Sequence, residues 1–264
     1  MSSTNRSSER GRRLDANPLD FYETPAACVD DLAEYLPELR HAPSARVRPA
    51  LVLDAGCGTG AIGLGLVEAF GPSLTPIVIG VELDEARACE AERRGLQVLR
   101  ADFTALDVDD VDDVDHVVGN PPFKDALDFI RHALAVVREG GFVAYLLRLN
   151  FFGSGSKRAD VLVDGSGLYA VFVMTDRPSF CTSAACKACR GTWQFEAGRP
   201  LSEALHPVAD DGEPECPHVG ERPTASGRYR ASRTDSCDYA WAVWQRGYTG
   251  PAKLVVIPTR KGSK

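Results

Sequence analysis

The stretch Leu53-Asp-Ala-Gly-Cys-Gly-Thr-Gly60 is the strongest indication of the fold in this sequence. It follows a short apolar run and precedes a predicted helix over residues 61–70. Glycines between a strand and a helix let the backbone approach a ligand closely, and the helix N-terminus favours a negative group. Gly58, Gly60 and Gly63 fit the dinucleotide fingerprint G-x-G-x-x-G, which alone is a weak signal. A dinucleotide site usually has apolar residues at the strand end, so the acid Asp54 there favours a cofactor other than a dinucleotide.

The sequence around this stretch alternates between apolar runs and helical periodicity. A helix starting at Ala26 is predicted, with Thr24 as its N-cap and Pro25 in its first turn. Strands are predicted at 51–54, 77–82, 96–99, 116–119 and 142–147, with helices at 61–70, 84–94 and 126–137 between them. Further strands are expected at 168–175, 239–244 and 254–257. This order predicts an α/β fold, an open parallel sheet with helices on both faces.

Composition narrows the class of protein. The 264 residues are 44% apolar with a net charge of −7, enough to bury a core and unlike a protein that coats nucleic acid indiscriminately. No apolar run approaches a membrane span, and the N-terminus lacks a secretory core segment, so we expect a soluble cytoplasmic protein. Residues 139–264 hold 16 bases and 13 acids, whereas residues 1–138 hold 14 bases and 24 acids, so a polyanion is expected to bind the C-terminal half. The acidic run 107–115 is expected to be a solvated loop.

The glycine loop resembles the first motif of class I S-adenosylmethionine-dependent methyltransferases, which have a Rossmann-like sheet. The resemblance implies that Asp54 and the loop glycines hold the methionine part of the cofactor. It also implies that an acid at the end of the second strand binds the ribose, and that an acid after the third binds the adenine amino group. The next residue would then pack on the adenine ring. The residues in these places are Asp54, Gly56, Gly58 and Gly60, then Glu82, then Asp102 and Phe103.

Asn120-Pro-Pro-Phe123 follows the fourth predicted strand. Methyltransferases that act on exocyclic or amide nitrogen carry a similar tetrapeptide there. The Asn120 side-chain oxygen and the Pro121 carbonyl are suited to accept hydrogen bonds from an amino group, which orients a poor nucleophile. Pro121 and Pro122 stiffen the turn, and Phe123 is expected to stack on the base. Asn120 is also expected to border the cofactor.

Other segments favour DNA adenine as the substrate. Asp20-Phe-Tyr-Glu-Thr-Pro25 resembles an N-terminal motif of adenine DNA methyltransferases, which implies that Tyr22, Thr24 and Pro25 lie near the cofactor. Segments 147–152, 177–180 and 234–244 together resemble phage and prophage N6-adenine methyltransferases. That resemblance implies that Phe180 lies beside a flipped base.

An insert of clustered cysteines departs from the phage pattern. Cys181, Cys186, Cys189, Cys216 and His218 supply one candidate more than a closed, structural Zn²⁺ site needs. Bases and a tyrosine crowd the same insert, which suits contact with phosphates and bases: Lys187, Arg190, Arg222, Arg228, Tyr229, Arg230 and Arg233. We therefore expect a flexible tail at 1–13, a catalytic domain at 14–180 and 234–264, and a zinc-binding target-recognition insert at 181–233.

Besides DNA adenine methylation, two other hypotheses for the function remain open at this point. RNA adenine or protein glutamine could be the methyl acceptor, because enzymes acting on them carry Asn-Pro-Pro-aromatic tetrapeptides as well. A third hypothesis is a nucleic-acid-binding module that keeps the fold without catalysis, and the intact tetrapeptide disfavours it. The recognition sequence, the strandedness of the target and the oligomeric state do not follow from the sequence.

Overall fold

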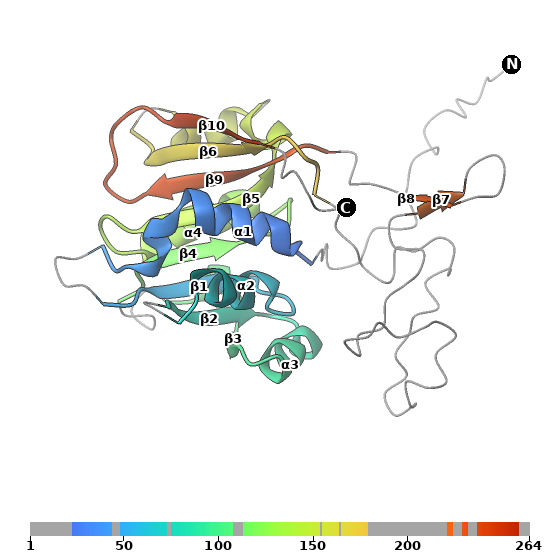
Figure 1. Ribbon diagram of the computed structural model, residues 1–264. Helices are drawn as coiled ribbons and strands as arrows, with labels where there is room; N and C mark the ends of the chain where they lie inside the picture. Colours follow the sequence, from blue (N-terminus) through green and yellow to red (C-terminus); the bar gives the residue numbers. More distant parts are fainter. Residues whose placement is uncertain are drawn as a thin grey trace, which may run out of the picture.

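One mixed sheet of eight strands forms the centre of the computed structural model (Figure 1). The structure describes residues 23–43, 48–72, 75–107, 113–153, 155–163, 165–178, 221–223, 229–231 and 237–258. In this part of the chain the sheet strands are β1 (Leu51–Ala55), β2 (Ile77–Glu82), β3 (Gln97–Arg100), β4 (His116–Gly119), β5 (Phe142–Arg148), β6 (Leu168–Met174), β9 (Tyr239–Gln245) and β10 (Lys253–Ile257). Their spatial order is β10-β6-β9-β5-β4-β1-β2-β3.

Helices cover both faces of this sheet, as the sequence predicts. The longer ones are α1 (Ala26–Tyr35), α2 (Ala61–Phe70), α3 (Glu85–Arg93) and α4 (Ala126–Val136), and α5 (Ala159–Leu162) is a single turn. Short 3-10 turns span Pro37–Arg40, Phe103–Ala105, Leu149–Phe152 and Ser156–Arg158. Buried residues of α1, α2 and α3 share one core cluster, and those of α4 and α5 share the cluster on the opposite face. No helix in the described ranges has the length and apolar character needed to cross a bilayer.

The strand directions differ from the sequence prediction at one place. β1, β2, β3, β4 and β5 are parallel, and so are β6 and β10, but β9 runs antiparallel to both β5 and β6. Tyr239 at the start of β9 pairs with Arg148 at the end of β5. The chain therefore enters β9 at the edge where the parallel strands end, and only the antiparallel direction keeps it within the sheet.

The strand β9 is the most deeply buried apolar segment of the sheet. Trp241 faces the α1 side and Trp244 faces the α5 side, and neither side chain is exposed. Each indole N–H donates to a helix carbonyl, to Cys28 O at 2.8 Å and to Val161 O at 2.7 Å. Because buried indole nitrogens need an acceptor, these two bonds fix where α1 and α5 cross the sheet.

A second, smaller sheet lies in the chain between β6 and β9. It consists of β7 (Glu221–Pro223) and β8 (Tyr229–Ala231), which pair antiparallel. The rest of the predicted insert lies outside the described residues, so its zinc site and its role in target recognition stay predictions.

Polar groups are buried where β1 and β4 begin. Asp115, expected in a solvated loop, has a fully buried side chain, so that expectation is wrong for this residue. Its carboxylate accepts hydrogen bonds from the Arg48 guanidinium at 2.7 and 3.0 Å and from Leu51 N at 2.8 Å. These three bonds compensate the desolvation of the carboxylate and join the starts of the two strands.

The next residue, His116, is also buried. Its Nδ1 accepts from Phe142 N at 3.0 Å, so its Nε2 carries the proton and donates to His41 O at 2.8 Å. Burial lowers the pKa of His116 from 6.5 to about 4. The folded protein therefore keeps this ring neutral in a range where the unfolded chain protonates it.

We expect the free energy of unfolding to fall as the pH drops from about 6.5 to about 4, because the unfolded state binds a proton that folded His116 refuses. The shift corresponds to about 3 kcal/mol. Urea unfolding followed at several pH values checks this, with His116→Gln as the comparison. The variant should lose much of the dependence in this window, and parallel curves for the two proteins would contradict the prediction.

Candidate active site

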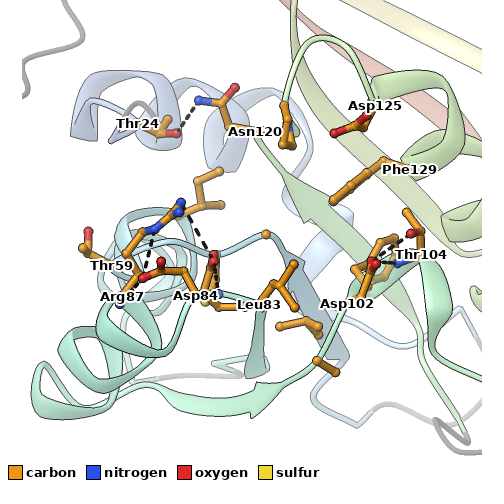
Figure 2. A pocket seen from close by; sticks show the side chains of 18 of the residues that line it. Thr24, Thr59, Leu83, Asp84, Arg87, Asp102, Thr104, Asn120, Asp125 and Phe129 are labelled. Carbon is orange, nitrogen blue, oxygen red and sulfur yellow. Dashed lines mark hydrogen bonds and ion pairs between the residues drawn. The ribbon is translucent and has the colours of Figure 1, made fainter. Parts of the chain in front are cut away.

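A cavity of about 530 Å³ opens where β1, β2 and β4 end (Figure 2). Its walls come from the glycine loop, the turns after β2, β3 and β4, the start of α4 and the residues just before α1. The lining residues are Glu23, Thr24, Gly56, Cys57, Thr59, Ala61, Ile62, Val81, Glu82, Leu83, Asp84, Arg87, Ala101, Asp102, Phe103, Thr104, Asn120, Pro122, Lys124, Asp125, Asp128 and Phe129. Ligands bind at this edge in open α/β sheets.

The glycine loop has a backbone that other residues rarely adopt. Gly56, Gly58 and Gly60 have φ angles of 70°, 56° and 87°, which lie in the left-handed region. The N–H groups of Gly56 and Cys57 donate to Val81 O at 2.9 and 3.0 Å, which holds the loop against the end of β2. Gly56 lines the cavity, whereas Gly58 and Gly60 lie buried beneath it.

Asp54 is fully buried at the end of β1 and does not line the cavity. Its Oδ2 accepts from Gly63 N in α2 at 2.8 Å, while Oδ1 has no hydrogen-bond partner. Burial first, and then the neighbouring charge of Glu82, raise the pKa of Asp54 to about 7. An orphaned, buried carboxyl oxygen behind the glycine loop fits a site that receives a cationic, hydrogen-bonding ligand.

Glu82 ends β2, is almost completely buried, and lines the cavity. Its Oε2 accepts from Gly58 N at 2.8 Å and its Oε1 accepts from Asp84 N at 2.9 Å. Arg87 lies 3.9 Å from the same carboxylate and 3.4 Å from that of Asp84. The acid predicted to bind a ribose therefore also supports the glycine loop.

Asp102 and Phe103 follow β3, as predicted, and both line the cavity. Asp102 is exposed, and its Oδ1 accepts from the N–H and the hydroxyl of Thr104 at 2.9 and 2.8 Å. The Phe103 ring is only 2% exposed and packs on Phe129, with 5.3 Å between ring centroids. Phe103 thus forms the floor of this side of the cavity and presents little surface to a ligand.

Leu83 is a lining residue that the sequence analysis missed. Its side chain is 72% exposed, a high value for a leucine, and Figure 2 shows it reaching into the space across from Asp102. An exposed leucine next to Glu82, the acid predicted to bind a ribose, suits the face of an aromatic ring. Its position directly after Glu82 is a signal that sequence reasoning could have used.

Asn120 follows β4 and faces the cavity from the side opposite Asp84 and Arg87 (Figure 2). Its Nδ2 donates to the hydroxyl of Thr24 at 3.2 Å. Thr24 was predicted to cap α1, but the capping position belongs to Pro25 and no side chain caps this helix. That prediction is wrong, because the Thr24 hydroxyl faces Asn120 instead of the helix.

The two prolines and Phe123 complete the tetrapeptide. Pro122 lines the cavity, Pro121 is buried, and the Pro122 carbonyl accepts from Asp125 N at 2.9 Å. Phe123 is only partly buried and does not line the cavity. The Arg148 guanidinium lies 3.7 Å from the centre of its ring. Phe123 therefore lies between the cavity and the edge where β9 begins.

Seven further predicted residues fall outside the described ranges. They are Tyr22, Phe180, Cys181, Cys186, Cys189, Cys216 and His218, so their roles stay predictions. Where the chain is described, no three His, Cys, Asp or Glu side chains gather as a metal site. The remaining predicted cofactor residue, Pro25, begins α1 next to Thr24 but does not line the cavity.

A known family matches the part of the chain that supplies most of the residues lining the cavity. Residues 33–147 match the family described as Methyltransferase small domain. The match runs from α1 to β5 and includes Asp54, Glu82, Asp102 and Asn120. A comparison with curated protein sequences gives no match.

Several solved structures share the fold. A putative class I S-adenosylmethionine-dependent methyltransferase from Listeria monocytogenes has a TM-score of 0.53 at 14% identity, covering 94% of this chain and 67% of that one. The methyltransferase subunit of a type I restriction-modification system from Streptococcus thermophilus has a TM-score of 0.55 at 13% identity, covering 89% and 47%. The type IIG restriction endonuclease BpuSI has a TM-score of 0.52 at 10% identity, covering 86% and 26%. The chain spans less than half of these last two proteins, and the likeness concerns the fold.

The buried Asp54 makes folding stability depend on pH in the opposite sense to His116. Its pKa is raised, so stability is present below the unfolded value of 3.8 and is lost as the pH rises through about 7. Asp54→Asn cannot ionise and should lose this dependence. Compared with the ligand-free wild type, the variant should gain stability between pH 5 and pH 8, as measured by urea unfolding. An equal stability difference at both pH values would show that Asp54 does not titrate in this range.

Proposed function

We propose that this chain, whose family match and fold indicate an S-adenosylmethionine-dependent methyltransferase, methylates the exocyclic N6 amine of adenine in DNA. The observation that carries the proposal is the placement of Asn120. It lies at the end of β4 and shares one cavity with the glycine loop, Glu82 and Asp102. A nitrogen-orienting amide thus borders the space that a methyl donor requires.

The residues present fit S-adenosylmethionine. Glu82 and Asp102 provide carboxylates for ribose hydroxyls and an adenine amino group, and Leu83 provides an apolar face for the ring. The Asp54 carboxyl, with its unpartnered Oδ1, lies behind the loop that would hold the methionine end. When bound, this cofactor supplies a methyl group activated by a positive sulfonium centre.

The chain's own task is to orient the acceptor nitrogen. The N6 lone pair of adenine is delocalised into the ring, so the amine is a poor nucleophile. Hydrogen bonds from the amine to Asn120 Oδ1 and the Pro121 carbonyl favour a tetrahedral nitrogen whose lone pair points at the methyl carbon. Asn120 is not a general base, so the amine would keep its protons until the methyl group has been transferred.

Three observations support DNA as the proposed acceptor. The structures with this fold include a restriction-modification methyltransferase subunit and a restriction endonuclease, and segments of the sequence resemble phage adenine methyltransferases. The predicted insert 181–233 supplies arginines and Tyr229, which suit contact with phosphates and bases. RNA adenine and protein glutamine remain the alternative acceptors, and a binding module without catalysis is the alternative of another class.

The acceptor is identified by methyl transfer with the product analysed. Purified protein and S-adenosylmethionine are incubated separately with unmethylated DNA, RNA and a protein extract, and the digests are analysed by mass spectrometry. We expect N6-methyladenine in DNA alone. Product in RNA or on glutamine would replace the substrate, and no product from a protein that binds the cofactor would favour the binding module.

Asn120→Ala should abolish most turnover and leave the cofactor in place. We expect a loss in kcat of about a hundredfold or more, the size seen when an orienting hydrogen-bonding group is removed. The dissociation constant of S-adenosylmethionine, measured by calorimetry, should change much less. Near-normal turnover in this variant would exclude the proposed role of Asn120.

The predicted zinc site has its own test. Replacing Cys186 and Cys189 by Ser should remove bound Zn²⁺, measured by atomic absorption on the purified protein, and weaken DNA binding together with it. Cofactor affinity should be retained, because the cavity lies on other residues. Unchanged DNA affinity in a zinc-free variant would separate the insert from target recognition.

A further inference from the structure

The Thr24 hydroxyl is a buried polar group that the helix next to it does not use. Thr24 is 6% exposed, and α1 has Pro25 rather than Thr24 in its capping position. The hydroxyl oxygen instead accepts from Asn120 Nδ2 at 3.2 Å, across 96 positions of sequence. Thr24, a residue type that often caps helices, therefore contacts the side-chain amide of Asn120 instead.

The residue before it anchors this segment to the other side of the cavity. Glu23 Oε1 accepts from the Thr59 hydroxyl at 3.0 Å and from Arg94 Nη1 at 2.8 Å. Arg94 Nη1 also donates to the Thr59 carbonyl at 3.0 Å. Thr59 belongs to the glycine loop and Arg94 directly follows α3, so residues 23 and 24 connect the glycine loop to Asn120.

We propose that Thr24 is a positioning residue that holds the Asn120 side chain in place at the cavity through this hydrogen bond. The proposal rests on the function proposed above. An asparagine side chain carries an acceptor and a donor at nearly equal distances, and a half-turn about its last bond exchanges them. With Nδ2 bound to Thr24, Oδ1 lies on the opposite side of the amide as an acceptor.

The orientation matters because the substrate group is itself a donor. An N6 amine facing Oδ1 gains a hydrogen bond, whereas an amine facing Nδ2 meets a second donor and loses its alignment. If the Asn120 amide is already fixed before the base binds, its Oδ1 does not have to reorient when the transition state forms. The anchored Glu23 keeps the Thr24 backbone from moving away, so the hydroxyl stays in place.

Thr24 also lines the cavity, so contact with the cofactor is the competing explanation. The two explanations predict different kinetics. A positioning role lowers kcat and leaves the dissociation constant of S-adenosylmethionine nearly unchanged. A cofactor contact raises that dissociation constant by at least as large a factor as the loss in kcat/KM.

The test compares Thr24→Val with Thr24→Ser in the full-length chain. Valine keeps the shape and removes the hydroxyl, and serine keeps the hydroxyl. We expect Thr24→Val to lower kcat about tenfold, the effect of one lost hydrogen bond. KM for DNA and the S-adenosylmethionine dissociation constant from calorimetry should stay within about twofold, and Thr24→Ser should recover most of kcat.

A readout without turnover is available from the side-chain amide itself. The ¹⁵N signals of the Asn120 amide, assigned by their loss in Asn120→Asp, should shift in Thr24→Val and stay near their positions in Thr24→Ser. A Thr24→Val protein with normal kcat and an unshifted amide would overturn the inference. So would a Ser variant as slow as the Val variant, or a loss confined to cofactor affinity. A wild-type protein that methylates no acceptor would instead refute the proposed function.

Discussion

The site depends on the close approach of three strand ends, which two glycines make possible. A Cβ on Gly119 at the end of β4 would lie 2.5 Å from the Ala55 carbonyl of β1. A Cβ on Gly80 in β2 would lie 2.5 Å from the Cys57 sulfur in the glycine loop. Both distances are far below a normal contact, so any side chain at either position would push the strands or the loop apart. Because these positions lack side chains, the glycine loop, Glu82 and Asn120 converge on one cavity.

This close approach also explains why charge is buried at the site. Asp54 is completely buried behind the loop, and Glu82 almost completely, with its oxygens bonded to the Gly58 and Asp84 N–H groups. Two carboxyl groups near each other in a space without bulk water raise the cost of ionising both. The cost is concentrated where the proposed methyl donor would bring positive charge. Without a bound ligand, the negative charge of Asp54 and Glu82 is therefore less well neutralised than that of Asp115. Asp115 lies at the opposite edge of the sheet and forms an ion pair with Arg48.

Local signals predicted most of the fold and several of the residues that line the cavity. Periodicity located the helices, since the buried residues of α2 and α4 follow it, and a continuous apolar run located the doubly buried strand β5. Direction and long-range contacts were not encoded locally. The antiparallel entry of β9 depends on where a long connection returns, the burial of Asp115 depends on Arg48 from another loop, and Thr24 satisfies every local rule for a cap. Its actual hydrogen-bond partner, Asn120, lies 96 positions away in the sequence and reaches the hydroxyl only in the folded chain.

The topology brings both ends of the connection between β6 and β9 to the edge of the sheet where the cavity lies. β6 ends and β9 begins at the same edge of the sheet where β4 delivers the Asn-Pro-Pro-Phe tetrapeptide. Arg177 after β6 and Asp238 before β9 form an ion pair at 2.6 Å, so the connection leaves and returns at one point. Tyr239 at that point lies 6.2 Å from the Phe123 ring centre. Both ends of the connection therefore lie beside Phe123, an arrangement that the proposed role of the insert in target recognition requires.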